Sequence, residues 1–164
     1  MSYKKAIENN PIMEDYYHES YGLALYHEGL FGGSIVQFEH AWRLNSTEKL
    51  TFNNIVHLNY CLGRVEKALE GFEEIFKNGL EAHYTYSNYI LVLYHLEKDE
   101  EMINKYKELL QPFIQSHRNA LLKIYQEELR ITQAILEKDG IDGKTKEFNQ
   151  KELKGINLVL SFIN

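Results

Sequence analysis

The residues most capable of chemistry in this chain are its seven histidines and its single cysteine, Cys61. A metal ion needs ligands about 2 Å away, but the sequence contains no HExxH motif and no second cysteine that would gather such ligands. His57 precedes Cys61 by one helical turn, an ordinary helical proximity that lacks the oriented His–Asp partner of a nucleophilic thiol. We therefore expect no metal, no cofactor and no enzymatic reaction.

Two loop-like stretches carry weaker signals. Residues 139–143 read DGIDG and faintly resemble a calcium loop, but they lack the full ligand spacing and the closing Glu. Gly143, Lys144 and Thr145 echo the end of a phosphate loop, yet Lys138 stands where that loop requires a Gly, and no strand precedes it. The first stretch is therefore expected to be a turn, and the second is rejected as a phosphate loop.

Composition narrows the class of protein. The chain has 164 residues, enough for one domain with an adequate core. Its net charge of −6 argues against a nucleic-acid groove, which needs a concentrated Lys/Arg surface.

The lone cysteine excludes an intrachain disulfide and fits a reducing compartment. Residues 1–12 do not read as a secretory signal, and no run of about 18 apolar residues could span a bilayer. We expect a cytoplasmic protein that binds neither nucleic acid nor membrane.

A repeat with a period of 34 residues runs through the middle of the chain. Residues recurring at this step are Gly29 and Gly63; Ser34, Ala68 and Met102; Phe38, Phe72 and Tyr106; Ala41, Ile75 and Leu109; and Tyr26, Tyr60 and Tyr94. Such a period is typical of one supersecondary unit copied along a solenoid, in which each copy buries its apolar face on its neighbours. This architecture predicts a binding scaffold but does not name the ligand.

Apolar residues at helical spacing predict two helices in each unit, and Gly29 and Gly63 are expected to end first helices in a left-handed conformation. Residues 14–112 hold three units, the last of which ends at Pro112. Residues 113–164 hold two longer helices, at about 116–138 and 145–163, which we interpret as a cap. Residues 1–13 look like the second helix of a unit whose first helix is absent, either an orphan helix or the end of a longer solenoid.

The repeated residues resemble the tetratricopeptide repeat (TPR) family, whose unit of about 34 residues has small residues at positions 8, 20 and 27 and an aromatic at position 24. The aromatic matches in all three units, and the resemblance covers about two-thirds of the chain. At position 8 only Gly22 fits, and the bulky Val56 and Ile90 predict slightly wider helix spacing. The resemblance implies an all-α solenoid of about three repeats with a concave groove.

In this family the first helix of each repeat lines the groove. The matching positions in this chain are Tyr16, Glu19, Leu23, Tyr26, His27, Leu50, Asn53, His57, Tyr60, Cys61, Tyr84, Ser87, Leu91, Tyr94 and His95. Asn54 and Asn88, at position 6 of successive repeats, could pair with a peptide backbone. The implied groove is aromatic, and Glu19 is its only formal charge when His is neutral. Because it contains no Lys or Arg, it does not suit capture of a terminal carboxylate.

A neutral aromatic concavity suits an extended or helical peptide with apolar anchors, because Tyr offers a large contact area at low entropy cost. We expect a non-enzymatic adaptor or chaperone whose partner is another protein or peptide. Two alternatives remain open: Tyr26, Tyr60 and Tyr94 could simply pack adjacent helices, and the uncovered N-terminal helix could drive self-association into a homodimer. Trp42 is expected to face away from the groove and to pack beneath the following helix rather than form an exposed anchor.

Overall fold

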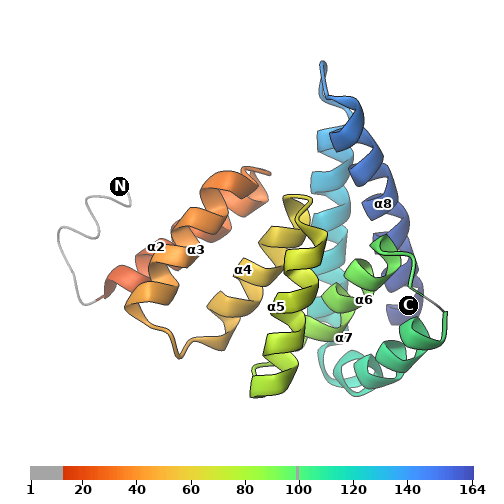
Figure 1. Cartoon of the computed structure of the whole chain (residues 1–164), viewed down its shortest axis with the longest axis horizontal. Coiled ribbons are helices and arrows are strands. Elements are labelled where there is room, and N and C mark those ends of the chain that lie inside the picture. The colour runs from red at the N-terminus through yellow and green to blue at the C-terminus, as the bar shows by residue number, and fades with distance from the viewer. Residues whose placement is uncertain (1–12, 99) are drawn as a thin grey trace. The chain divides into compact units, whose positions relative to one another are not determined.

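The computed structural model describes residues 13–98 and 100–164. Within these residues the protein forms seven helices and no strand: α2 (Glu14–His27), α3 (Phe31–Leu44), α4 (Lys49–Cys61), α5 (Val65–Asn78), α6 (Thr85–His95), α7 (Glu100–Leu136) and α8 (Gly143–Ile163) (Figure 1). The predicted all-α class is confirmed. The predicted N-terminal half-repeat helix lies outside the described residues.

The chain divides into two compact units, Met1–Ala82 and His83–Asn164. Unit 1 contains α2 to α5, and unit 2 contains α6 to α8. The first two predicted repeats therefore belong to unit 1. The third predicted repeat shares unit 2 with the two C-terminal helices.

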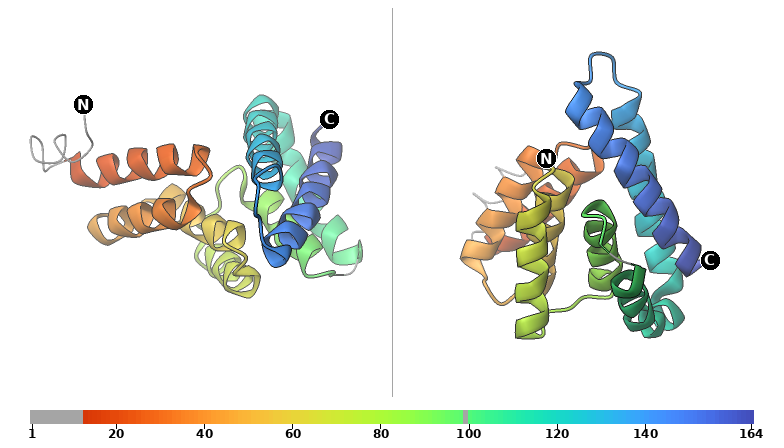
Figure 2. Two further views of the ribbon diagram at one scale, coloured as in Figure 1. Left: turned by 90° about the horizontal axis from the view of Figure 1, so that it is seen from above. Right: turned by 45° about the vertical axis from the view of Figure 1, so that its right-hand side comes forward.

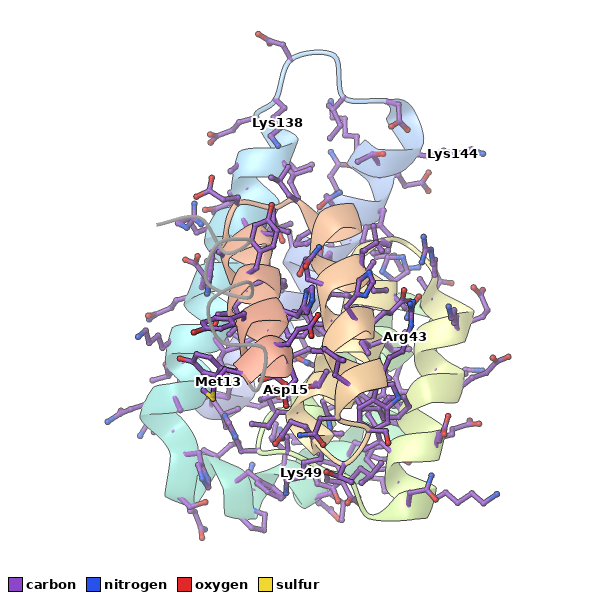
Figure 3. The ribbon with its side chains drawn as sticks, turned by 90° about the vertical axis from the view of Figure 1, so that its left-hand side faces the viewer. Met13, Asp15, Arg43, Lys49, Lys138 and Lys144 are labelled. Carbon is purple, nitrogen blue, oxygen red and sulfur yellow. The ribbon has the colours of Figure 1, made fainter. Side chains whose placement is uncertain are left out.

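The first helical pair of unit 1 consists of α2 and α3, which run side by side in opposite directions, so that Asp15 at the start of α2 lies near the end of α3 (Figure 3). The Asn45 amide donates to Asp15 Oδ2 at 3.2 Å. The helices approach closely at Gly22, where a Cβ would lie 2.9 Å from the Phe38 ring. The buried Ser34 hydroxyl also donates to the Gly22 carbonyl oxygen at 2.7 Å. Gly22 therefore sets how close the two backbones come.

The second pair packs on the first through α3 and α4. Ile35, Phe38 and Leu58 form a buried apolar cluster that spans these two helices. The Trp42 ring of α3 stacks on Phe52 of α4, with ring centroids 5.1 Å apart and planes 29° apart. The prediction that Trp42 packs beneath the following helix is confirmed.

The turn that follows the first helix of each pair has the same geometry three times. Gly29, Gly63 and Glu97 have φ angles of 70°, 72° and 54°. Their N–H groups donate to the carbonyl three residues back at 2.8, 2.8 and 3.1 Å, and the next N–H donates to the carbonyl five residues back at 2.9, 2.9 and 3.0 Å. This pair of bonds is a Schellman motif. The predicted left-handed glycines are confirmed, and Glu97 adopts the same conformation although it breaks the sequence pattern.

Val56 occupies a position at which the resemblance to the TPR family predicts a small residue. Room for the Val56 side chain is left by a glycine on the opposite helix, α5. A Cβ on Gly71 of α5 would lie 2.6 Å from Val56 Cγ2, closer than two carbon atoms can approach. The glycine at the close contact therefore lies on the first helix in one pair, at Gly22, and on the second helix in the other, at Gly71. This exchange removes the reason for the wider spacing that Val56 predicted.

In unit 2, α7 continues through Pro112 and is interrupted at His117 instead. The backbone leaves helical values at His117 (φ −129°, ψ 20°), which separates residues 100–116 from 118–136. The prediction that the helix ends at Pro112 is wrong, because a proline inside a helix removes one backbone donor and kinks the helix without having to stop it. The Ser116 hydroxyl donates to the Pro112 carbonyl oxygen at 2.9 Å, a bond that also favours bending.

Residues 118–136 of α7 and the whole of α8 run side by side, joined by the loop at residues 137–142 (Figure 2), and both helices pack on α6. Tyr125 is fully buried and donates from its hydroxyl to Asn88 Oδ1 at 2.5 Å. Gly155 of α8 comes so close to α6 that a Cβ there would lie 3.2 Å from both Leu91 and Tyr94. The two C-terminal helices thus cover the first helix of the third predicted repeat.

The DGIDG loop is a helix cap. Asp142 accepts the backbone N–H of Thr145 at 3.0 Å and its hydroxyl at 2.5 Å. These bonds to Thr145 lower the pKa of Asp142 from its ordinary value. The prediction of a turn at this stretch is confirmed. None of the described helices combines the length and the apolar character needed to cross a bilayer.

Candidate functional site

Two side-chain hydrogen bonds join α2 to α4 and hold the first helices of the two pairs in unit 1 side by side. The Thr51 hydroxyl of α4 donates to Glu19 Oε1 of α2. Farther along, the Tyr26 hydroxyl of α2 lies 3.4 Å from Nε2 of His57. The joined sides of these helices form a surface that we call the α2–α4 face. Its exposed or half-buried residues are Tyr16, Glu19, Leu23, Tyr26, His27, Leu50, Asn54 and Cys61.

Three apolar residues of the α2–α4 face are open to solvent. Tyr16 is 55% exposed, Leu23 44% and Leu50 43%. Tyr16 and Leu23 are followed by the exposed His27 at a spacing that places all three on one side of α2. Exposed apolar area is unfavourable by about 25 cal/mol per Å², and side chains grouped in this way are typical of a contact surface.

Three predicted groove residues of unit 1 are buried. Asn53 is fully buried, and its amide donates to the carbonyl oxygens of Lys49 and Leu80, both at 2.8 Å. His57 is 6% exposed and Tyr60 only 1% exposed, and their rings stack at 6.2 Å. In this structure these side chains support the helices rather than offer a surface to a ligand.

Cys61 and His57 are neighbours, as their spacing on one helix predicts. Cys61 Sγ lies 3.5 Å from His57 Nε2, the same atom that faces the Tyr26 hydroxyl. Over the described part of the chain, no group of three or more His, Cys, Asp or Glu side chains could hold a metal ion.

In unit 2 the predicted groove residues of α6 are covered by the chain's own helices. Ser87, Asn88 and Leu91 are at most 3% exposed. The His95 ring lies 4.5 Å from the ring of Phe148 on α8. The side of α6 that carries these residues is therefore occupied by α7 and α8.

Tyr84 and Tyr94 lie at the two ends of α6 and are half-buried. The Tyr84 carbonyl oxygen accepts the Ser87 hydroxyl at 2.9 Å, whereas the Tyr94 side chain packs against Gly155. The three tyrosines of the repeat ladder consequently differ: Tyr26 and Tyr94 are half-buried, and Tyr60 belongs to the interior.

One residue that the sequence patterns did not single out is Thr51, whose hydroxyl engages the only carboxylate of the α2–α4 face. A helical wheel of α4 places Thr51 about 100° from Leu50. Once α2 and α4 are known to be adjacent, that angle turns Thr51 toward α2. The missing information was which side of α4 meets α2, and the period alone does not supply it.

The α2–α4 face offers both apolar and polar contacts. Its apolar side chains can bury a partner's apolar groups, while the Tyr16 hydroxyl can exchange hydrogen bonds with a peptide backbone. Comparisons with models of known protein families, with curated proteins and with solved structures found no match.

Proposed function

We propose that the chain is a TPR-like repeat protein of the cytoplasm that works without catalysis, as an adaptor or chaperone, by holding a peptide segment of another protein on its α2–α4 face. The observation that carries the proposal is the exposure of Tyr16, Leu23 and Leu50 on two adjacent helices. Their side chains can contact a partner without any rearrangement of the core.

Repetition of structure supports the TPR-like organisation. The three Schellman turns at Gly29, Gly63 and Glu97 recur at the period of the sequence repeat. Each turn joins two helices that pack on one another: α2 on α3, α4 on α5, and α6 on α7. A unit of two packed helices copied at a constant step is the element from which helical solenoids are built.

The C-terminal half of the chain supports the binding mode. On α6, the inner positions of the repeat are covered by α8, a helix that contacts Leu91 and Tyr94 through Gly155. The inner side of this helical pair therefore accepts another helix. We infer that the equivalent side of α2 and α4 accepts a helical or extended segment of a partner, which would use the same i and i+3 or i+4 anchors.

The test is a selection of binding peptides from a displayed library, followed by fluorescence-anisotropy titration of the best peptide. We expect the Tyr16→Ala/Leu23→Ala variant to weaken binding about tenfold, since truncation of a central apolar anchor costs more than about 1 kcal/mol. Val36→Ala is the matched control, because Val36 is as exposed as Leu23, 45% against 44%, but lies on α3.

Equal losses for the control and the double variant would show that the contact surface lies elsewhere.

The second candidate function is self-association. The observation that favours it is the exposure of Met13 and Tyr16 at the first described turn of α2, 40% and 55%. Light scattering over a range of protein concentrations separates the two, because a mass that doubles with concentration supports a homodimer and a constant monomer mass excludes it.

A further inference from the structure

Asn78 is the last residue of α5, and it is the one asparagine in the sequence that a glycine follows. Asn78 and Gly79 are both exposed. Gly79 has a left-handed conformation (φ 65°, ψ 35°), and a Cβ built on it would meet nothing within 4 Å. Because glycine has no side chain, its backbone nitrogen is open to approach. The Asn78 side-chain amide and the Gly79 nitrogen therefore meet at an exposed, uncrowded end of the helix.

Hydrogen bonds hold this end of α5 in its folded form. Asn78 Nδ2 donates to the Glu74 carbonyl oxygen at 2.9 Å. The Leu80 N–H donates to the Ile75 carbonyl oxygen at 3.0 Å. The first of these bonds directs the Asn78 amide toward the preceding turn instead of toward Gly79. Both bonds belong to the last turn, the part of a helix that opens most readily.

Asn157 of α8 provides a comparison within the same chain. It is exposed, and its Nδ2 donates to the Leu153 carbonyl oxygen at 2.8 Å, which is the bond to the fourth residue back that Asn78 also makes. Leu158 follows it, inside the helix. The next backbone nitrogen therefore carries a branched side chain beside it and belongs to the helical hydrogen-bond ladder. Asn78 differs from Asn157 in the glycine and in its place at the helix end.

We propose that Asn78 is a site of spontaneous deamidation, which proceeds when the last turn of α5 opens. The Gly79 nitrogen loses its proton to water and bonds to Asn78 Cγ. The Cγ–Nδ2 bond breaks, and Nδ2 takes up a proton and leaves as ammonia. Water then opens the resulting succinimide ring. Attack at Cγ gives aspartate and attack at the backbone carbonyl carbon gives isoaspartate, so each conversion consumes one water and releases one ammonia.

Either product weakens the end of α5. A carboxylate cannot donate to the Glu74 carbonyl oxygen, so the bond from residue 78 is lost. The new negative charge lies at the C-terminus of a helix, where the macrodipole makes an anion unfavourable. The Glu74 side chain is one turn away on the same side, whereas the adjacent Lys77 faces a different side. We therefore expect the last turn to open more often after the reaction than before it.

Peptide mapping of the protein after incubation in mildly alkaline buffer tests the assignment. Trypsin releases residues 78–98, a peptide that contains Asn78 and the buried Asn88. We expect the mass gain of an amide-to-carboxylate replacement at Asn78, and no gain at Asn88 or Asn157. An absence of gain at Asn78 by the time a synthetic peptide of residues 74–83 has reacted completely, or an equal gain at Asn157, would overturn the proposal.

The rate tests the opening step. The folded protein should react more slowly than the synthetic peptide, because the bonds of the last turn must break first, and it should approach the rate of the peptide in urea. Equal rates without urea would contradict that step. Asp139 and Asp142 also precede glycines and can isomerise without a change of mass, so the mass gain is the readout. Asn78→Gln is the matched control, since its longer side chain does not form a succinimide, and it should abolish the gain.

Asn78→Asp reproduces the aspartate product. Its urea midpoint should lie below that of Asn78→Gln, because glutamine keeps an uncharged amide donor at this position. Circular dichroism checks that the helices remain in both variants. A midpoint of Asn78→Asp equal to or above that of Asn78→Gln would contradict the weakening of α5. Because Asn78 lies outside the α2–α4 face, failure of this proposal leaves peptide binding there unaffected, and the reverse also holds.

Discussion

At the residue scale, Val56 and Gly71 show how a repeat tolerates a departure from its own pattern. In the first pair the small residue is Gly22 on α2, which faces Phe38. In the second pair the large residue is Val56 on α4, and Gly71 on α5 makes room for it. Each pair thus contains one glycine at its closest contact, although on opposite helices.

Replacement of Gly71 by Ala should therefore destabilise the protein. The added methyl would lie 2.6 Å from Val56 Cγ2, and overpacking of this kind costs about 1–3 kcal/mol. Gly32→Ala is the control, because a Cβ on Gly32 of α3 meets nothing within 4 Å; that change should stabilise the helix by up to about 1 kcal/mol. Urea denaturation measures both.

The Val56→Ala/Gly71→Ala protein completes a double-mutant cycle. If the two side chains compete for one space, the double variant should be more stable than the sum of the single changes predicts. Strict additivity would show that Val56 and Gly71 do not share a contact.

A second prediction at this scale concerns His83, whose ring stacks on His117 with centroids 5.1 Å apart and planes 14° apart. Burial, and secondarily the charge of His117, lower the pKa of His83 from its ordinary value of 6.5. The unfolded chain then binds a proton more readily than the folded one. The stability that neutral His83 contributes is therefore complete above about pH 6.5 and is lost as the pH falls below that value.

Urea midpoints measured from pH 7.5 to pH 5 should consequently fall less steeply for His83→Phe than for the unmodified protein, because Phe retains a stacked ring that does not titrate. His27→Phe serves as the control, since His27 is exposed and lies in unit 1. An unchanged pH slope in His83→Phe would assign the acid sensitivity to other groups.

At the element scale, the three turns that follow α2, α4 and α6 share one conformation, which supports the proposed repeat. The left-handed conformation of Gly29 and Gly63 could be predicted from the sequence, because glycine tolerates a positive φ. That of Glu97 could not, since a residue with a Cβ rarely adopts that conformation. Its turn is set by the packing of α6 and α7 on either side, which overrides the local preference of the residue.

Glu97→Gly should therefore raise the melting temperature by a few degrees, because it relieves a left-handed conformation that costs L-residues energy. The ion pair with Lys151 is lost, but Glu97 is 80% exposed and such pairs contribute little. Glu97→Ala loses the same ion pair and retains the strain. A melting temperature of Glu97→Ala equal to or above that of Glu97→Gly would contradict strain at this position.

The C-terminal helices mark the limit of sequence reasoning at this scale. Their existence and the loop before α8 followed from apolar spacing and from the DGIDG stretch. The break at His117 did not follow from the sequence, because Pro112 is the stronger local signal and His117 carries none. Nor did the approach of Gly155 to Leu91 and Tyr94, which is set by two helices far apart in sequence.

At the scale of the whole molecule, the sequence showed one continuous repeat, and the structure divides it after Ala82. The groove positions were inferred from a repeat pattern that treats every first helix alike. Tyr16, Leu23 and Leu50 are exposed, whereas Ser87 and Leu91 are covered by α7 and α8. A period predicts which residues are equivalent, but not which of them the rest of the chain covers.

The division predicts that residues 83–164 fold without the first unit. Their interior contains the buried side chains of Leu121, Tyr125, Ile156 and Val159, all supplied by unit 2. The isolated fragment should show helical circular dichroism and one cooperative thermal transition. A fragment that is unfolded, or that melts without a transition, would mean that unit 1 supplies essential contacts.

The central claim is that the α2–α4 face holds a partner's peptide, and amide chemical-shift mapping by NMR tests it most directly. A peptide selected for binding is added to the ¹⁵N-labelled protein, and the perturbed residues are compared with the two units. We predict that the largest shifts cluster at Tyr16, Leu23, His27 and Leu50. Shifts confined to α6 and α8, or to α3 and α5 alone, would contradict the claim.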